Sequence, residues 1–139
     1  MNKTDENTPD ALRQQLLTDL APMASLAYQR RYIVCGDVQH GYLLPDELLN
    51  NLHYRLTRFR SHPESHSAFS LPQFAALDQL FTLLDALPTD IDSVPNEELV
   101  ERHAGWGAVR EQCAVCLTLL GFDLAEWEAN DLNENSRNA

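Results

Sequence analysis

Apolar residues recur at spacings of three and four along most of this 139-residue chain, and this pattern constrains the fold more than any other feature. Such spacing places side chains on one face of an α-helix. Three segments carry it most clearly: Leu12, Leu16, Leu20, Met23 and Ala27; Leu48, Leu49, Leu52, Leu56 and Phe59; and Phe74, Leu77, Leu80, Phe81, Leu84 and Leu87. Neither a hairpin signal nor period-two alternation accompanies them. The sequence therefore predicts an all-α, single-domain bundle of five to seven helices.

Local capping signals mark the ends of these helices. Pro9 suits the first helical position and Pro45 opens the second helix. Ser70 and Gln73 form a Ser-x-x-Gln capping box before the third helix. Pro22 is expected to kink the first helix or to divide it in two. Because the third helix has an apolar face wide enough to contact several neighbours, we place it at the centre of the bundle.

Further helices are expected in the second half of the chain. Residues 108–120 predict a strongly buried helix, and Gly121 ends it in a position that tolerates a left-handed backbone. Two glycines just before it, in AGWGAV, predict a joint between helices. Asp123 and Glu126 form a capping arrangement for a short final helix. Residues 35–41 predict a turn, and RRYIVC at residues 30–35 is either helix or a short strand.

The composition of the two ends sets the expected domain bounds. Residues 1–7 and 130–139 have too little apolar content to stay ordered, so we predict two disordered tails around a helical domain at residues 8–129. No secretory signal and no run of about 20 apolar residues is present, which predicts a cytoplasmic protein without a membrane partner. Three cysteines, an odd number, argue against a disulfide framework.

Three short motifs resemble chemical sites, and each has a simpler structural interpretation. Cys113 and Cys116 have the spacing of a zinc half-site or a redox pair, but they lie inside an apolar helical stripe, which favours two small buried side chains. HPESH at residues 62–66 contains a proline, which favours a loop over a zinc-binding helix. Residues 90–95 begin like a calcium loop but lack its glycine. We therefore predict no catalytic, cofactor-binding or metal-binding residue, and no enzyme.

The charge is strongly negative and unevenly distributed. The formal net charge is −11, and residues 78–139 hold 13 of the 21 acidic side chains but only 3 of the 10 basic ones. Nucleic acid is therefore a poor ligand, since phosphate binding depends on Lys and Arg, and a basic protein is the expected partner. Five arginines could pair with acidic groups of this chain or of another: Arg30, Arg31, Arg55, Arg58 and Arg60.

Six carboxylates and no Lys or Arg lie within residues 85–101, and we predict them as the partner-binding residues: Asp85, Asp90, Asp92, Glu97, Glu98 and Glu101. The dipole of a helix starting at Pro95 explains Glu97 and Glu98, since both would lie in its first turn. It does not explain the other four. Two interpretations stay open, a solvated face and a docking surface for a basic protein.

In overall character the chain resembles the small acidic immunity proteins of bacterial toxin systems, including those of contact-dependent growth inhibition. The resemblance rests on a short single domain, the absence of a catalytic motif and the acidic segment at residues 85–101. Many such proteins neutralise a nuclease by covering its basic cleft. The resemblance thus implies a non-catalytic domain that binds a cognate basic toxin and neutralises it by stoichiometric occlusion.

Two other classes remain open. An acidic secretion chaperone or adaptor should form a dimer and expose an apolar groove for its client. An enzyme with scattered histidines and carboxylates would use some of the five histidines, which are His40, His53, His62, His66 and His103. The sequence does not determine the oligomeric state or the identity of the partner.

Overall fold

The computed structural model describes residues 9–36 and 43–138, without the side chains of Pro9, Glu64, Ser65, Asp92 and residues 134–138. Over these residues the regular structure is entirely helical, which confirms the predicted all-α bundle. The α-helices are α1 (Pro9–Ala24), α2 (Leu26–Gln29), α3 (Pro45–Ser61), α4 (Leu71–Asp85), α5 (Asn96–Arg102), α6 (Ala104–Leu119) and α7 (Leu124–Asn138). A π-helical turn, η2 (Arg30–Val34), and two 3-10 turns, η3 (Pro63–Ala68) and η4 (Ile91–Ser93), lie between them. The tail predicted at residues 1–7 lies outside the described residues.

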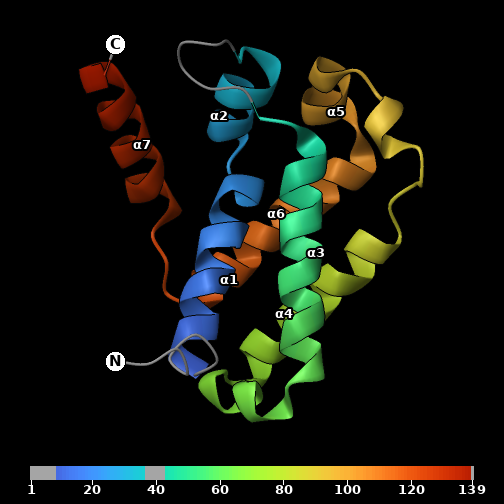
Figure 1. The fold of residues 1–139 in the computed structure, drawn as a ribbon, viewed down its shortest axis with the longest axis vertical. Helices are drawn as coiled ribbons and strands as arrows, with labels where there is room; N and C mark the ends of the chain where they lie inside the picture. Colours follow the sequence, from blue (N-terminus) through green and yellow to red (C-terminus); the bar gives the residue numbers. More distant parts are fainter. Residues whose placement is uncertain (1–8, 37–42, 139) are drawn as a thin grey trace.

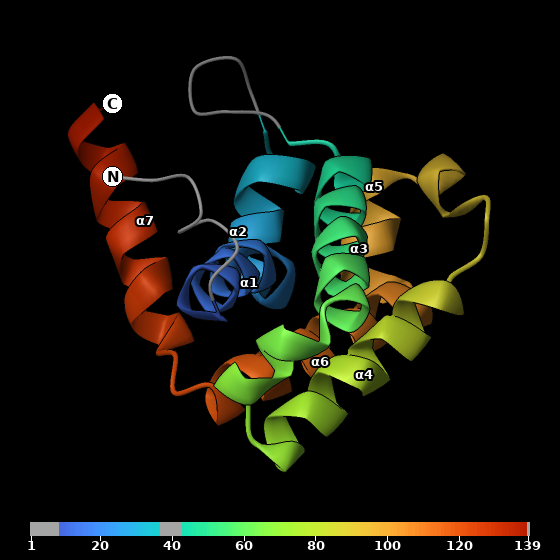
Figure 2. The same ribbon diagram turned by 60° about the horizontal axis from the view of Figure 1, so that its bottom comes forward.

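The prediction that the third helix lies at the centre of the bundle is wrong, because α4 packs mainly against α6 and α3, whereas α1 packs against α2, α3, α6, α7 and η3. Helix α6 packs against α1 on one side and α4 on the other, while α3 lies across α1 and α4 (Figures 1 and 2). Its inward stripe includes Trp106, Val109 and Cys113, all of them fully buried. Phe74 and Phe81 of α4 are only partly buried.

The first helical segment is divided in two, as Pro22 predicts. Pro22 lies in the last turn of α1, the helix ends at Ala24, and Ser25 caps α2 by accepting from the Tyr28 amide at 3.0 Å. The segment RRYIVC is not a strand. Residues 30–34 form the π-helical turn that continues α2, because its backbone groups bond locally instead of pairing with another strand.

The helix ends follow the local signals with two exceptions, the start of α6 and the end of α7. The Ser70–Gln73 capping box forms in both directions, and Gly121 has φ +77°, as a left-handed cap requires. However, α6 begins at Ala104 rather than at residue 108, because the His103 side chain accepts from the Trp106 amide at 3.1 Å. The glycines of AGWGAV therefore lie in the first turn of α6 and not in a joint.

The last helix is longer than its composition predicts. Asp123 accepts from the Glu126 amide at 3.0 Å, as expected, but α7 then continues to Asn138 instead of ending before a disordered tail at residues 130–139. Backbone groups of a helix form hydrogen bonds within the helix, so polar residues can extend it without being buried in a hydrophobic core. The Tyr32 hydroxyl also donates to the Asp131 carboxylate at 3.1 Å, which ties this part of α7 to η2. No helix among the described residues is long and apolar enough to cross a bilayer.

Candidate functional site

The predicted acidic residues lie along one continuous edge of the bundle. They run from the end of α4 through the segment containing η4 to α5, on the side facing away from α7 (Figures 1 and 2). The exposed members are Asp85, Asp90, Glu97, Glu98 and Glu101. The side chain of Asp92 lies outside the described residues. The structure therefore brings the set to one side of the molecule, but its members have different surroundings.

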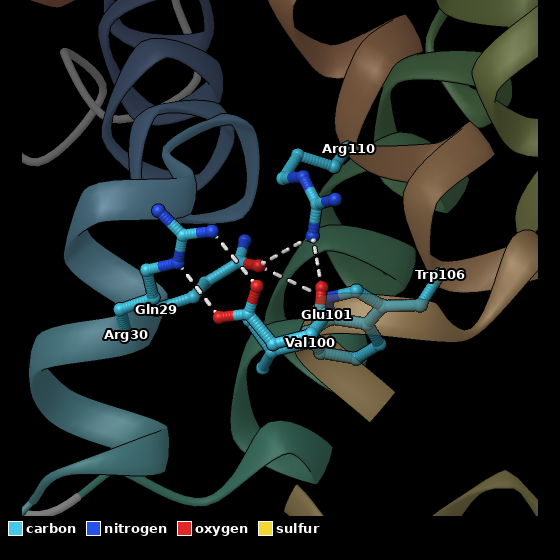
Figure 3. A network of polar contacts seen from close by, with 6 residues as sticks. All are labelled: Gln29, Arg30, Val100, Glu101, Trp106 and Arg110. Carbon is cyan, nitrogen blue, oxygen red and sulfur yellow. Dashed lines mark hydrogen bonds and ion pairs between the residues drawn. The ribbon is translucent and has the colours of Figure 1, made fainter. Parts of the chain in front are cut away.

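Glu101 is held by an arginine of the same chain. Both oxygens of its carboxylate accept from the Arg30 guanidinium, at 2.7 and 2.8 Å (Figure 3). This bidentate contact lowers the pKa of the Glu101 carboxyl and raises that of Arg30. It joins α5 to η2 across a sequence separation of 71 residues. Glu101 therefore serves to position α5 and is less available to an outside cation.

Asp85 also has a partner within the chain, His53. The Nε2 atom of His53 lies 3.3 Å from its carboxylate, and the His53 ring stacks on Phe81 with ring centroids 5.2 Å apart. The Asp85 side chain is still 58% exposed. Asp85 therefore links α4 to α3 while keeping one side open to solvent.

Asp90, Glu97 and Glu98 form the unpaired part of the acidic edge. Within residues 9–36 and 43–138, no ion pair reaches any of the three, and all are exposed. Glu97 and Glu98 lie in the first turn of α5, where the helix dipole favours a carboxylate. Asp90 lies before the short turn η4 and gains no such benefit from a long helix. We call these three residues the unpaired carboxylates.

A buried polar network holds α5 from behind. Gln29 is fully buried, and its Oε1 atom accepts from Trp106 Nε1 at 2.9 Å and from Arg110 Nη1 at 3.2 Å (Figure 3). Arg110 also donates to the backbone oxygen of Val100 at 3.0 Å. Burial of Leu99 and Val100 fixes the inner face of this short helix, so Glu97 and Glu98 stand on a helix that is held from its inner side.

Several arginines of residues 30–60 form ion pairs with carboxylates of the same chain. Arg55 Nε lies 2.9 Å from the carboxylate of Asp19, and Arg60 Nε lies 3.6 Å from that of Asp78. Arg30 is bound to Glu101 as described above. Arginines of residues 30–60 therefore neutralise carboxylates on α1, α4 and α5, but in the described part of the chain none of them pairs with Asp90, Glu97 or Glu98.

The two cysteines of α6 are core residues, as predicted. Cys113 and Cys116 are buried free thiols, and burial raises the pKa of both, that of Cys116 to about 12. Thiolate chemistry at neutral pH is thereby suppressed. Among the described residues, no three His, Cys, Asp or Glu side chains come close enough together to hold a metal ion.

The four described histidines each have a separate partner. His62 and His66 interact with the backbone oxygens of Arg58 and Phe59, at 2.9 and 3.0 Å. His62 directly precedes the 3-10 turn η3 and His66 lies in it, where a loop was predicted. His103 caps α6, and His53 contacts Asp85. His40 lies outside the described residues. Of these four, only His53 is paired with a carboxylate.

Sequence reasoning also missed pockets that open between the helices. One of about 190 Å³ opens between α2 and α7, beside Tyr28, Trp127 and Leu132. Another of about 190 Å³ lies between α3 and the end of α4, beside His53 and Ile91. Each is formed by residues far apart in the chain, so no local pattern could have revealed it.

Fold and site together define a small helical domain with an acidic edge that is only partly neutralised by its own arginines. No protein-family model, curated protein or solved structure matches the chain. The function must therefore be argued from the geometry of this edge.

Proposed function

We propose that this chain is a non-catalytic immunity protein that binds a cognate basic toxin and neutralises it by stoichiometric occlusion. The observation that supports the proposal is the set of unpaired carboxylates, Asp90, Glu97 and Glu98, which are exposed without a cation while neighbouring carboxylates are paired within the chain. A basic partner would supply the missing counter-charges. If the partner is a nuclease, these carboxylates take the place of substrate phosphates.

The support beneath α5 favours binding over simple solvation. The Arg30–Glu101 contact and the Gln29–Arg110 network hold α5 in one position before any partner arrives. Pre-organised charges lose little entropy on association, and they steer an oppositely charged partner towards one orientation. The expected signature is fast, salt-sensitive association.

The test begins with co-purification from the source cell at low and at high salt, using the tagged chain as bait. Any protein recovered in equal amount is then produced together with the chain. The proposal expects one basic protein at low salt, and its toxicity should disappear when both are expressed. Recovery of no stoichiometric partner at either salt would make the acidic edge a solvated face.

A matched pair of triple variants then locates the interface. The variant D90N/E97Q/E98Q removes the unpaired carboxylates, and D10N/E111Q/E126Q removes three other exposed charges, two of them also in first helical turns. The first should bind the toxin about tenfold more weakly with a smaller salt dependence. The second should bind as the natural chain does. Equal affinity of both variants would remove the acidic edge from the interface.

An acidic secretion chaperone is the second candidate, because of the pocket between α2 and α7. Leu132 at its rim is 52% exposed, and Tyr28 and Trp127 give it an aromatic wall. A chaperone of this kind should be a dimer. Light scattering after gel filtration tests this candidate, because a monomeric free chain would contradict it.

A further inference from the structure

A small pocket lies where the acidic edge begins, between α3 and the segment that follows α4. Its volume is about 190 Å³. Most of its lining is apolar, and two polar residues of α3 complete the wall: the lining residues are Leu49, Asn50, His53, Leu84, Leu87, Pro88 and Ile91. We call this the α3–α4 pocket. It can hold one long side chain but not a folded segment.

Three segments carry carboxylates next to residues that line the α3–α4 pocket. Asp85 contacts His53 in its wall, and Asp90 directly precedes Ile91, which lines it. Asp46 lies one helical turn before Asn50 on the same side of α3. No lysine or arginine is among the lining residues. An apolar interior with a negatively charged rim suits a side chain that has an aliphatic stem and a cationic end.

We propose that the α3–α4 pocket receives one lysine or arginine side chain of the basic partner and so anchors it on the acidic edge. The stem packs against Leu49, Leu84 and Ile91, and the cation reaches the rim carboxylates. This inference rests on the proposed function. It names the contact that fixes where on the acidic edge the partner binds. An uncharged apolar side chain would fill the interior but leave the rim without a counter-charge.

An arginine of α3 itself already packs against α4 in a comparable way. Arg60 lies two turns after His53, and its guanidinium carbon is 4.4 Å from the centroid of the Phe81 ring. Its Nε atom is 3.6 Å from the Asp78 carboxylate. Phe81 also stacks on His53. A guanidinium between an aromatic ring and a carboxylate is therefore an arrangement that this surface accommodates.

Capped tripeptides test the pocket before any partner is known. The probe is acetyl-Gly-Arg-Gly-amide, and its control is the citrulline analogue, which has nearly the same shape without the charge. Methyl NMR should show saturable shifts at Leu49, Leu84, Leu87 and Ile91 with the arginine peptide. The citrulline peptide should bind about tenfold more weakly, as the loss of a charge-assisted contact predicts.

Two tryptophan variants separate occupancy of the pocket from general attraction to the acidic edge. Asn50→Trp fills the pocket, whereas Asn51→Trp places the same side chain at the adjacent exposed position of α3. The first should abolish the methyl shifts and the second should preserve them. The variant D85N/D90N should weaken the arginine peptide but not the citrulline peptide.

The outcomes distinguish this inference from the function on which it rests. If the NMR shifts were confined to residues around Glu97 and Glu98 and the methyl groups of the pocket did not shift, the anchoring role of the pocket would be refuted. Docking of a basic partner on the acidic edge would not be affected. Equal binding of both peptides would also overturn it, because the cation would then play no part. Once a toxin is identified, loss of binding by Asn50→Trp but not by Asn51→Trp would support the anchor directly. Unchanged binding by both would overturn it while the immunity function stands.

Discussion

Replacement of Gln29 by methionine tests the buried network most directly. The side chain is fully buried and nearly the same size as methionine, so the change removes hydrogen bonds without opening a large cavity. Gln29 Nε2 donates to the backbone oxygens of Pro22 and Met23, at 3.1 and 2.7 Å. Its Oε1 atom accepts from Trp106 and Arg110. The two carbonyls belong to the end of α1, where the break at Ser25 removes their helical partners.

The expected cost follows from the groups left without a partner. The two carbonyls and the Trp106 indole N–H each lose this hydrogen bond, while Arg110 keeps its bond to Val100. A buried polar group without a partner costs about 1–3 kcal/mol, so three cost about 3–9 kcal/mol. Water can reach the end of a helix, which favours the lower part of that range, about 3–5 kcal/mol. This is a large fraction of the 5–15 kcal/mol that is typical of a domain's total stability.

Urea unfolding followed by circular dichroism measures this cost, and a double-mutant cycle isolates its origin. Trp106→Phe removes the indole donor, so Gln29→Met should cost about 1–3 kcal/mol less in that background. Arg110→Met serves as a second partner for the cycle. A cost below about 1 kcal/mol for Gln29→Met, or strict additivity with Trp106→Phe, would refute the view that this network holds α1, α2 and α6 together.

Three further outcomes are expected. A thiol reagent should modify only Cys35 in the folded chain and all three cysteines in urea, because burial protects Cys113 and Cys116 and raises the pKa of both. The number of reactive thiols is measured by absorbance, and more than one per folded chain would contradict this burial. Gly121→Ala should cost about 1–2 kcal/mol in chemical unfolding, since no atom clashes but φ is +77°, and Gly121→Asn should cost less. Arg30 lowers the pKa of the Glu101 carboxyl, so their contact stabilises the fold at pH values above the pKa of Glu101 in the unfolded chain, and this stabilisation is lost as the pH falls through the lowered pKa. In thermal melts from pH 7 to pH 3, the melting temperature of Arg30→Gln should therefore fall less steeply than that of the natural chain. An equal fall in both would show that the pair contributes nothing to stability.

The prediction of the central helix failed for a reason that is visible in particular residues. The apolar face of α4 is wider in sequence than that of α6, yet Phe74 and Phe81 end up only partly buried. The helix with the most neighbours is α1, whose Leu16, Leu20 and Met23 are all fully buried. Hydrophobic periodicity identifies a buried face but does not rank the helices by their number of neighbours.

Membership of the candidate site was only partly predictable for a similar reason. The sequence shows that all six carboxylates lie within residues 85–101. Whether each of them is paired with a cation depends on arginines and histidines that are distant in sequence. Glu101 is neutralised by Arg30, 71 positions away, and Asp85 contacts His53, 32 positions away. The α3–α4 pocket is formed by segments that meet only in the folded chain.

The sequence by itself determined the local features: helix spacing, the break after Pro22, the capping box at Ser70 and the left-handed turn at Gly121. These depend on backbone sterics and on hydrogen bonds between residues a few positions apart, so they can be inferred without a fold. Only the tertiary structure decided which carboxylates are paired, which helix is central and where the pockets open. Those properties arise from contacts between distant segments, and the packing of the whole bundle brings such segments together.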